Sequence, residues 1–373
     1  MKKKPNVPKS ILFVIPGLGS GGAEHQSVTI ARLLKKKGYA VEFWCYFDFD
    51  FYDEILKNEG IVIHRKVCNY VKRIYYTTRF IYRGHFDVVI SFMDTPNFLN
   101  NFAAIGKHSW TVITSIRATP QKEEFLSFKG RIYGWLYRNS DVVITNSEHT
   151  LNVFGSFFPS LRSKIATIYN AVQLGEIDSD YIVKKESRLN VVIAATISKV
   201  KNPMGLLNAL ELLTAEERSL IHIDWYGKSE SVIGDHSEYD KVVERIQRSQ
   251  LEELISLPGE TKDIADIMNR ADCIALFSQS EGLPNAICEG MMIGKPIIMT
   301  RVSDYWNLVE EDINGYLCDW DNPSSIKDAL LKMARLDKEE LKKMGVSSRN
   351  KANRFFSKDA ITQQWVNLID GNE

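Results

Sequence analysis

Two carboxylates in the last third of the chain have a spacing that suits ligand binding. Glu281 and Glu289 are separated by seven residues. The apolar run 273–277 is typical of a buried parallel strand, and a helix is expected from Pro284 to Gly294, because proline fits a first helical turn and glycine ends a helix. Glu281 is therefore expected in the crevice at the carboxyl end of the strand, and Glu289 one to two turns into the helix.

The turn between these carboxylates supplies hydrogen-bond donors. The backbone amides of Leu283, Asn285 and Ala286 lie at the expected helix N-terminus, where the positive end of the helix favours a diphosphate. Amides for phosphate, flanked by carboxylates that accept hydrogen bonds from hydroxyl groups, suit a nucleotide sugar. On spacing alone, a capped helix with two solvated glutamates fits equally well.

A second cluster, residues 195–203, follows the first expected strand of the second half. Lys199 and Lys201 lie at this strand exit, where a lysine can neutralise a leaving diphosphate as a point charge. For an isolated lysine, a solvated basic turn is the simpler interpretation.

A glycine-rich loop lies near the N-terminus. Gly17-x-Gly19-x-x-Gly22, between an expected strand and an expected helix, formally matches the dinucleotide-binding fingerprint. An NAD site also requires an acidic residue at the end of the second strand, whereas Glu42 falls within that strand and Asp48 follows late. The pattern alone indicates only a close approach of backbone to a phosphate or a sugar.

Short apolar runs alternate with helical patterns along the whole chain, which predicts parallel sheets with helices on both faces. The 373 residues allow about two domains. We expect an α/β protein with two Rossmann-like, doubly wound domains, 1–170 and 171–355, that face a central cleft. A C-terminal helix, 356–373, is expected to pack back on the first domain, and helix breaks are expected near Leu336 and Ser357. Strands are expected at 11–15, 40–47, 62–64, 88–92, 112–116, 142–145, 190–195, 221–226, 254–257, 273–277, 296–299 and 316–318.

The zero net charge hides an asymmetry between the two halves. Residues 1–170 carry 23 Lys and Arg against 13 Asp and Glu, and residues 171–373 carry 24 against 34. The basic half is also aromatic: residues 70–83 hold four cations, five aromatic side chains and no acid, and residues 125–138 repeat the theme. Such helices suit an anionic membrane surface or a lipid-diphosphate acceptor. Two helices that pack their aromatic side chains inward fit the pattern equally well.

Several classes are disfavoured. No run approaches the roughly 18 apolar residues that span a bilayer, and no apolar signal region follows the Lys-rich N-terminus. The five cysteines are scattered without a Cys-x-x-Cys pair, which favours reduced thiols in a cytoplasmic protein over a structural zinc site. No nucleic-acid partner is expected.

Taken together, the motifs resemble those of the retaining GT-B glycosyltransferases of family 4. The likeness rests on Gly21-Gly22-Ala23-Glu24, Lys201-Asn202, Glu281-x7-Glu289 with Glu-Gly-Leu-Pro, and the later turn Asn314-Gly315-Tyr316-Leu317. These motifs occur in family order, and the resemblance covers essentially the whole chain.

The resemblance implies a UDP-sugar donor held mainly by the second domain, transfer with retention, and no metal or cofactor. It places Glu289 on the ribose hydroxyls, Glu281 on the donor-sugar hydroxyls and Lys201 on the departing phosphate. The donor-binding residues that it implies are Gly19, Gly21, Gly22, Thr196, Lys199, Gly282, Leu283, Asn285, Ala286 and Glu289.

Two positions depart from the family pattern. Members usually carry an arginine five residues before the lysine, where this chain has Thr196, so half of the leaving-group clamp is missing unless Lys199 substitutes. Many members have a histidine near the donor sugar, and Arg117 lies at about that place. It is expected to be catalytic together with Lys201 and Glu281. The Ser-x-Arg-x-x-Pro turn around it resembles the branch that adds N-acetylhexosamines to lipid-linked oligosaccharides, although a surface arginine with a structural role is the alternative.

Two Asp-x-Asp sequences, 48–50 and 319–321, match the metal motif of the other large glycosyltransferase fold. That fold binds its nucleotide in one domain and leaves the ordered motifs of the second half unexplained. We therefore expect no metal.

The expected function is that of a cytoplasmic, peripherally membrane-associated glycosyltransferase. It would use a UDP-sugar, UDP-N-acetylhexosamine, to extend a polysaccharide or a lipid-linked saccharide. A non-catalytic or weakly active subunit of the same fold, motivated by Thr196, is the second interpretation. An NAD-dependent oxidoreductase that uses the loop at Gly17 is the third.

Overall fold

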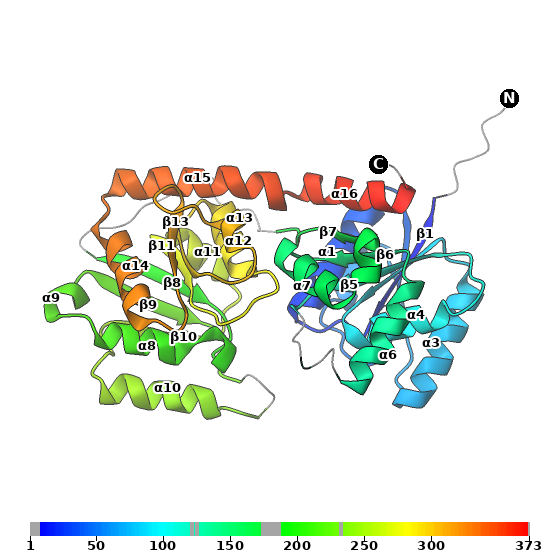
Figure 1. The fold of residues 1–373 in the computed structure, drawn as a ribbon, viewed down its shortest axis with the longest axis horizontal. Helices are drawn as coiled ribbons and strands as arrows, with labels where there is room; N and C mark the ends of the chain where they lie inside the picture. The colour runs from blue at the N-terminus through cyan, green and yellow to red at the C-terminus, as the bar shows by residue number, and fades with distance from the viewer. Residues whose placement is uncertain (1–7, 120–122, 124–126, 173–187, 231–233, 372–373) are drawn as a thin grey trace. The chain divides into compact units, whose positions relative to one another are not determined.

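Each half of the chain builds its own parallel β-sheet. A computed structural model describes residues 8–119, 123, 127–172, 188–230 and 234–371, in which the chain divides into two compact units. Unit 1 comprises residues 1–171 and 358–373, and unit 2 comprises residues 172–357 (Figure 1). The division lies one residue after the boundary expected at residue 170.

Unit 1 contains a seven-stranded sheet in the order β3-β2-β1-β4-β5-β6-β7, with every pairing parallel. Its strands are β1 (Ser10–Ile15), β2 (Ala40–Cys45), β3 (Val62–Arg65), β4 (Val88–Phe92), β5 (Thr111–Ile116), β6 (Val142–Thr145) and β7 (Ile165–Thr167). Its helices are α1 (Gly22–Lys36), α2 (Asp53–Asn58), α3 (Tyr70–Gly84), α4 (Asp94–Ala103), α6 (Phe128–Leu136), η1 (Tyr137–Asn139), α7 (Glu148–Phe157), η2 (Pro159–Lys164) and α16 (Lys358–Asp370).

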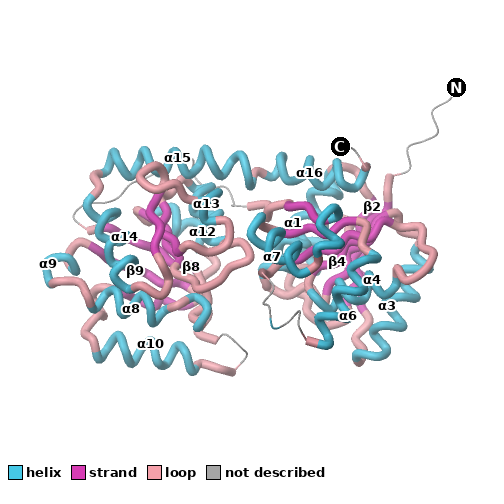
Figure 2. The backbone as a smooth tube through the Cα atoms, viewed as in Figure 1, coloured by secondary structure: helices cyan, strands magenta, loops and turns pink. Residues whose placement is uncertain are grey.

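Unit 2 contains a six-stranded parallel sheet in the order β10-β9-β8-β11-β12-β13. Its strands are β8 (Leu189–Ala194), β9 (Ile221–Tyr226), β10 (Ile255–Gly259), β11 (Cys273–Leu276), β12 (Ile297–Thr300) and β13 (Gly315–Cys318). Its helices are η3 (Lys199–Lys201), α8 (Pro203–Glu211), α9 (Ala215–Arg218), α10 (Ser237–Arg248), α11 (Ile264–Arg270), α12 (Asn285–Ile293), α13 (Tyr305–Leu308), α14 (Pro323–Arg335) and α15 (Lys338–Phe356) (Figure 2).

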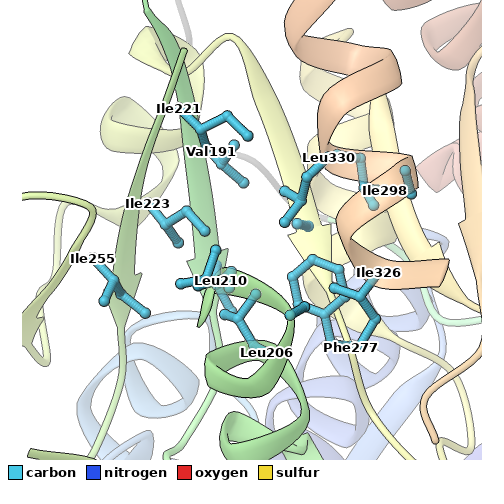
Figure 3. Close-up of a cluster of buried hydrophobic side chains, with 14 of the residues drawn as sticks. Val191, Leu206, Leu210, Ile221, Ile223, Ile255, Phe277, Ile298, Ile326 and Leu330 are labelled. Atoms are coloured by element: carbon cyan, nitrogen blue, oxygen red, sulfur yellow. The ribbon is translucent and has the colours of Figure 1, made fainter. Parts of the chain in front are cut away.

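Both sheets are covered by helices, and their central strands are buried. Every residue of β4, β11 and β12 is buried, as expected for strands of a parallel sheet that is packed on both faces. In unit 2, Leu206 and Leu210 of α8 and Leu330 of α14 belong to one cluster with Val191 of β8 and with Phe277, which directly follows β11 (Figure 3). Burying a side chain of this size contributes about 1.5–3 kcal/mol. This core fixes the strand ends that carry the site.

Local signals define the C-terminal helices. Asp337 and Glu340 form a capping box at the start of α15, and the expected breaks near Leu336 and Ser357 separate α14, α15 and α16. The last helix belongs to unit 1, where Tyr39 donates to Asp370 at 2.9 Å. None of the described helices combines the length and the apolar character needed to span a bilayer.

Several expected boundaries were wrong. The edge strand β7 is absent from the sequence-based expectation because it has three residues and none of them is buried. The second strand ends at Cys45 rather than at residue 47, because the amides of Tyr46 and Phe47 both donate to Pro16. Helix α12 begins at Asn285, and Pro284 is its N-cap rather than its first residue.

Candidate active site

The turn between β11 and α12 brings Glu281 and Lys201 together. The Lys201 ammonium forms an ion pair with Glu281 Oε1, and the Ser278 hydroxyl donates to the same oxygen at 2.6 Å. Both charged side chains are mostly buried, since 26% of the Lys201 side chain and 11% of the Glu281 side chain are exposed. An ammonium has three N–H donors, so this pairing leaves Lys201 the capacity to bind a phosphate oxygen as well.

Neighbouring strand ends hold this turn in place. The Ser303 hydroxyl donates to the Gly282 carbonyl at 2.6 Å, and the Thr300 hydroxyl donates to the Ser278 carbonyl at 2.6 Å. The Gln279 amide donates to the Val200 carbonyl at 2.8 Å, which ties the turn to the lysine-bearing loop. Donors and acceptors preset in this way lose little freedom when a ligand binds.

Helix α12 supplies the expected amides. Its first backbone hydrogen bond is donated by the Ile287 amide to the Pro284 carbonyl at 3.0 Å, so Asn285 and Ala286 occupy the first turn. The positive end of a helix favours an anion at this turn. Leu283 is buried just before the helix. The helix can lie close to the sheet because Gly290 has no side chain: a Cβ at this position would meet Ile274 Cγ1 at 2.7 Å.

Glu289 lies on the fifth position of α12 in a desolvated environment. Burial raises the pKa of Glu289 to about 7 from its ordinary 4.5. No hydrogen bond or ion pair of its carboxylate occurs within the described residues of the chain. A carboxylate held in this way is suited to accept hydrogen bonds from the hydroxyl groups of a ligand.

The lysine-bearing loop follows β8 and separates its two lysines. Lys199 to Lys201 form the 3-10 turn η3, after which Asn202 adopts a left-handed conformation and donates to the Trp320 carbonyl at 2.8 Å. Lys199 is exposed and lines a cavity of about 440 Å³ together with α10, whereas Lys201 contacts Glu281. Thr196 is half-buried on the same loop.

A second cavity of unit 2, of about 690 Å³, lies at the carboxyl ends of β9 and β10. Gly227 and Gly259 line it, and the Gly227 amide donates to the Gly259 carbonyl at 3.0 Å. A side chain at Gly227 would collide with the Ala195 carbonyl, since its Cβ would lie 1.9 Å from that oxygen. Both glycines are half-buried and present no side chain to the cavity, which suits a planar base.

In unit 1, the glycine loop between β1 and α1 packs under an aromatic segment. The Leu18 amide donates to the Phe49 carbonyl at 3.0 Å, and a Cβ at Gly17 would meet Phe49 at 3.0 Å. Gly21 and Gly22 are exposed at the start of α1, and Gly19 is half-buried. Gly17 therefore serves packing, while the exposed part of the loop is open to a ligand.

Arg117 is held inside unit 1, which contradicts the interpretation as a surface arginine. Its guanidinium stacks on the Phe92 ring at 4.6 Å and donates from Nη1 to Asn170 at 2.9 Å. Burial lowers the pKa of Arg117 to about 9, so it stays charged at neutral pH. Nε and Nη2 are buried and have no hydrogen-bond partner within the described part of the chain.

Arg117 lines a cavity of about 610 Å³ at the carboxyl ends of β4 and β5. Asp94, Lys129 and Tyr133 also line this cavity, and the preceding Met93 has φ 74° and ψ 164°, a region that is essentially restricted to glycine. Lys129 and Tyr133 belong to the basic, aromatic stretch 125–138 that the sequence singled out. Sequence reasoning missed Met93, Asp94 and the serines that fix the Glu281 turn. The one available signal was the position of Ser278, three residues before Glu281.

The two Asp-x-Asp sequences lie in different units, 48–50 in unit 1 and 319–321 in unit 2. Asp319 forms an ion pair with Arg301 at 3.0 Å, and Asp48 is exposed. Among the residues that the structure describes, no three His, Cys, Asp or Glu side chains form a group that could hold a metal.

Comparison with known proteins agrees with this arrangement. The chain matches the profile described as Glycosyltransferase Family 4 over residues 20–176 and the profile described as Glycosyl transferases group 1 over residues 176–351. The solved structure of Anabaena HepE in complex with UDP and glucose superposes with a TM-score of 0.81 at 17% identity, over 97% of this chain and 100% of that one.

Two curated relatives align over nearly their full length. The human alpha-1,3/1,6-mannosyltransferase ALG2 is 24% identical over 99% of this chain and 97% of its own. A Campylobacter jejuni alpha-1,4-N-acetyl-D-galactosaminyltransferase, named for the acceptor GalNAc-alpha-(1->4)-GalNAc-alpha-(1->3)-diNAcBac-PP-undecaprenol, is 24% identical over 96% of this chain and 98% of its own. Three other curated relatives match over 59%, 60% and 65% of their own length.

The fold and the matched profiles define a glycosyltransferase of the GT-B type, with two Rossmann-like parallel-sheet domains, and this confirms the predicted fold class. Within that class, the chain belongs to the glycosyltransferases of group 1 and is similar to those of family 4.

Proposed function

We propose that the chain transfers a sugar, an N-acetylhexosamine, from a UDP-sugar to a polysaccharide or lipid-linked saccharide, with retention and without a metal. The observation that carries the proposal is the pairing of Lys201 with Glu281 beside the first turn of α12. This arrangement offers a cation and backbone amides to a leaving diphosphate, and a carboxylate to sugar hydroxyls.

The proposed donor site lies on unit 2. Glu289 accepts hydrogen bonds from the ribose hydroxyls, the amides of Asn285 and Ala286 bind the diphosphate, and the uracil ring occupies the cavity at Gly227 and Gly259. UDP as the nucleotide is supported by the HepE structure, which contains UDP. The N-acetylhexosamine is supported by the name of the Campylobacter relative, whereas ALG2 is named as a mannosyltransferase.

The proposed acceptor site is the 610 Å³ cavity of unit 1. The buried, unpaired donors of Arg117 are suited to an anionic or hydroxyl-rich acceptor, and Lys129 adds a second cation to the cavity wall. The five cysteines are free thiols, which is compatible with the cytoplasmic location included in this proposal.

In the proposed mechanism, the acceptor oxygen attacks the anomeric carbon on the face from which the diphosphate leaves. The chain contributes mainly by positioning both substrates and by stabilising the negative charge that develops on the leaving oxygen. Lys201 acts at this oxygen, and its removal is expected to lower kcat by about 10²–10³-fold, the range for loss of one preorganised donor.

The test is the release of nucleotide from UDP-GlcNAc, UDP-GalNAc, UDP-glucose and GDP-mannose in the presence of saccharide acceptors. We expect turnover with a UDP-N-acetylhexosamine that falls at least 100-fold in Lys201→Ala and is retained in Lys262→Ala, an exposed lysine of the same unit. Full turnover by Lys201→Ala with an intact fold would refute the leaving-group role. Binding of UDP-sugars without transfer would instead favour the weakly active subunit suggested by Thr196.

A further inference from the structure

Helix α3 exposes apolar side chains although it is packed against unit 1 along one side. Its buried residues are Arg73, Thr77 and Ile81, with Tyr76 and Phe80 partly buried beside them, whereas Val71 and Tyr75 are 76% and 59% exposed. A helix at a water-exposed surface normally buries its apolar stripe and presents its polar one. The exposed apolar stripe of α3 therefore indicates a surface that is not covered by water alone.

The orientation of α3 is fixed by the contacts of Arg73 and Thr77. The Arg73 guanidinium stacks over the Tyr46 ring at 4.1 Å and over the Phe47 ring at 4.7 Å, and Thr77 accepts a hydrogen bond from Trp44 Nε1 at 2.8 Å. Because these contacts hold the polar side of α3 against unit 1, the helix cannot rotate to bury Val71 and Tyr75 without breaking them.

Two further helices extend the exposed apolar surface. Helix α4 packs between α3 and α6 (Figures 1 and 2). The ring of Phe98 on α4 lies 6.5 Å from the ring of Tyr70 on α3 and 5.3 Å from the ring of Tyr133 on α6. On α6, Phe128 is 81% exposed, and Ile132 and Trp135 follow it at the spacing of one helical face. We name this surface the α3–α6 face; its exposed apolar residues are Tyr70, Val71, Tyr75, Tyr82, Phe102, Phe128, Ile132 and Trp135.

The face is also strongly basic. The exposed cations on α3 and α6 and directly after α6 are Lys72, Arg79, Arg83, Lys129, Arg131 and Arg138, and neither helix contains an Asp or a Glu. Between α3 and α4, Arg79 and Arg83 line a groove of about 570 Å³ together with Tyr75, Tyr82 and Phe102. Apolar rings with cations among them match the interfacial region of an anionic bilayer, where rings enter the headgroup boundary and cations bind lipid phosphates.

We propose that the α3–α6 face docks unit 1 on an anionic membrane surface. Charge complementarity selects this occupant over a second copy of the chain, because two copies of so basic a face would repel each other. Helix α6 connects the face to chemistry: Phe128 points into the proposed lipid boundary, while its neighbours Lys129 and Gly130 line the 610 Å³ cavity. That the docked face delivers a lipid-linked acceptor to this cavity rests on the proposed function.

The experiment is flotation of the full chain with vesicles of phosphatidylcholine alone or mixed 3:1 with phosphatidylglycerol. We expect binding to the mixed vesicles at low salt, little binding to phosphatidylcholine alone, and a loss of at least about tenfold in the variant Arg79→Glu/Arg83→Glu. The variant Tyr75→Ser/Phe128→Ser/Trp135→Ser is expected to lose binding as well.

The controls lie on unit 2. Lys342→Glu/Lys343→Glu makes the same change of charge as the double arginine variant, and Leu212→Ser/Val346→Ser replaces two exposed apolar side chains. Both are expected to bind like the wild type. Circular dichroism and UDP-sugar affinity check that each variant is folded. Absence of wild-type binding to the mixed vesicles, or equal binding by the face variants, would overturn the inference. If the wild type forms a dimer that the aromatic substitutions abolish, and does not bind vesicles, the face binds a second copy of the chain. This result would also overturn the inference. Vesicle binding without sugar transfer would preserve the inference and remove the proposed function.

Discussion

Replacement of Glu289 by glutamine is predicted to stabilise the free protein while it weakens donor binding. In the wild type, burial raises the pKa of Glu289 to about 7, and no ion pair compensates its charge within the described residues. Glutamine has nearly the same shape and carries no charge. The substitution therefore removes the desolvation penalty and keeps the packing of α12.

The size of the change in the free energy of unfolding follows from the pKa shift of Glu289. A rise of the pKa from 4.5 to about 7 corresponds to about 3 kcal/mol, at 1.36 kcal/mol per pH unit. Because the folded state holds the proton more tightly than the unfolded state, wild-type stability is fully present below pH 4.5 and is lost as the pH rises through about 7. The stability of Glu289→Gln relative to wild type should therefore increase by up to about 3 kcal/mol between pH 4.5 and pH 8.

The assay is urea unfolding of both proteins across this pH range. Glu211→Gln provides a control of opposite sign, because Arg245 donates to Glu211 at 2.5 and 2.6 Å and holds the pKa of that carboxyl at about 2. That stabilisation is present above pH 4.5 and is lost as the pH falls toward 2, so Glu211→Gln should destabilise the protein at neutral pH. If the free energies of unfolding of the wild type and of Glu289→Gln change in parallel with pH, the argument that burial raises the pKa of Glu289 is refuted.

Three further predictions concern the site. Affinity for a UDP-sugar should fall as the pH drops below about 7 in the wild type but not in Glu289→Gln, measured by calorimetry, because the ionised carboxylate is the better acceptor for hydroxyl groups; equal profiles would contradict this role. Gly290→Ala should lower the stability of unit 2 by about 1–3 kcal/mol in urea, because its Cβ would lie 2.7 Å from Ile274 Cγ1; an unchanged midpoint would argue against tight packing there. Arg117→Ala should raise the KM for the acceptor at least tenfold and leave the KM for the UDP-sugar within about twofold; the reverse pattern would move Arg117 to the donor.

Much of the fold follows from local sequence. The strands at 88–92, 142–145 and 221–226 were predicted with their observed bounds. The first two are short, mainly apolar runs, and the third alternates buried apolar residues with His222, Asp224 and Tyr226. Gly294 ends α12 in a left-handed conformation, as expected for a C-terminal glycine. Edge strand β7 could not be found in this way, because it lacks the apolar pattern that burial imposes.

The contacts of the site depend on strand order and are less visible in the sequence. Lys201 and Glu281 are 80 positions apart, and they meet because β8 and β11 are neighbours in the sheet and end at the same edge. The environment of Arg117 likewise depends on Phe92 and Asn170, which tertiary packing brings to it. The residue types and their order could be taken from the sequence, whereas the pairing of Lys201 with Glu281 was not predicted and depends on the topology.

The basic, aromatic pattern of residues 70–83 left two interpretations open. The structure agrees with the inward-packing interpretation at Tyr76 and Phe80, which pack against the core of unit 1. It departs from that interpretation at Arg73, which is buried, and at Tyr75, which is exposed. Periodicity gave no sign of this, because the side of a helix that faces the core is set by its partners. Of the second stretch, 125–138, residues 125 and 126 lie outside the described residues.

The most direct test of the donor site is thermal stabilisation by UDP, GDP and NAD, measured on the wild type and on Glu289→Ala. At a hundredfold excess over the dissociation constant, a ligand adds about 2.7 kcal/mol of stability, which gives a clear shift of the melting temperature. We predict stabilisation of the wild type by UDP that is lost in Glu289→Ala, with no comparable effect of NAD. Stabilisation by NAD, or no response to UDP, would contradict the assignment of a UDP-sugar site to the β11–α12 turn.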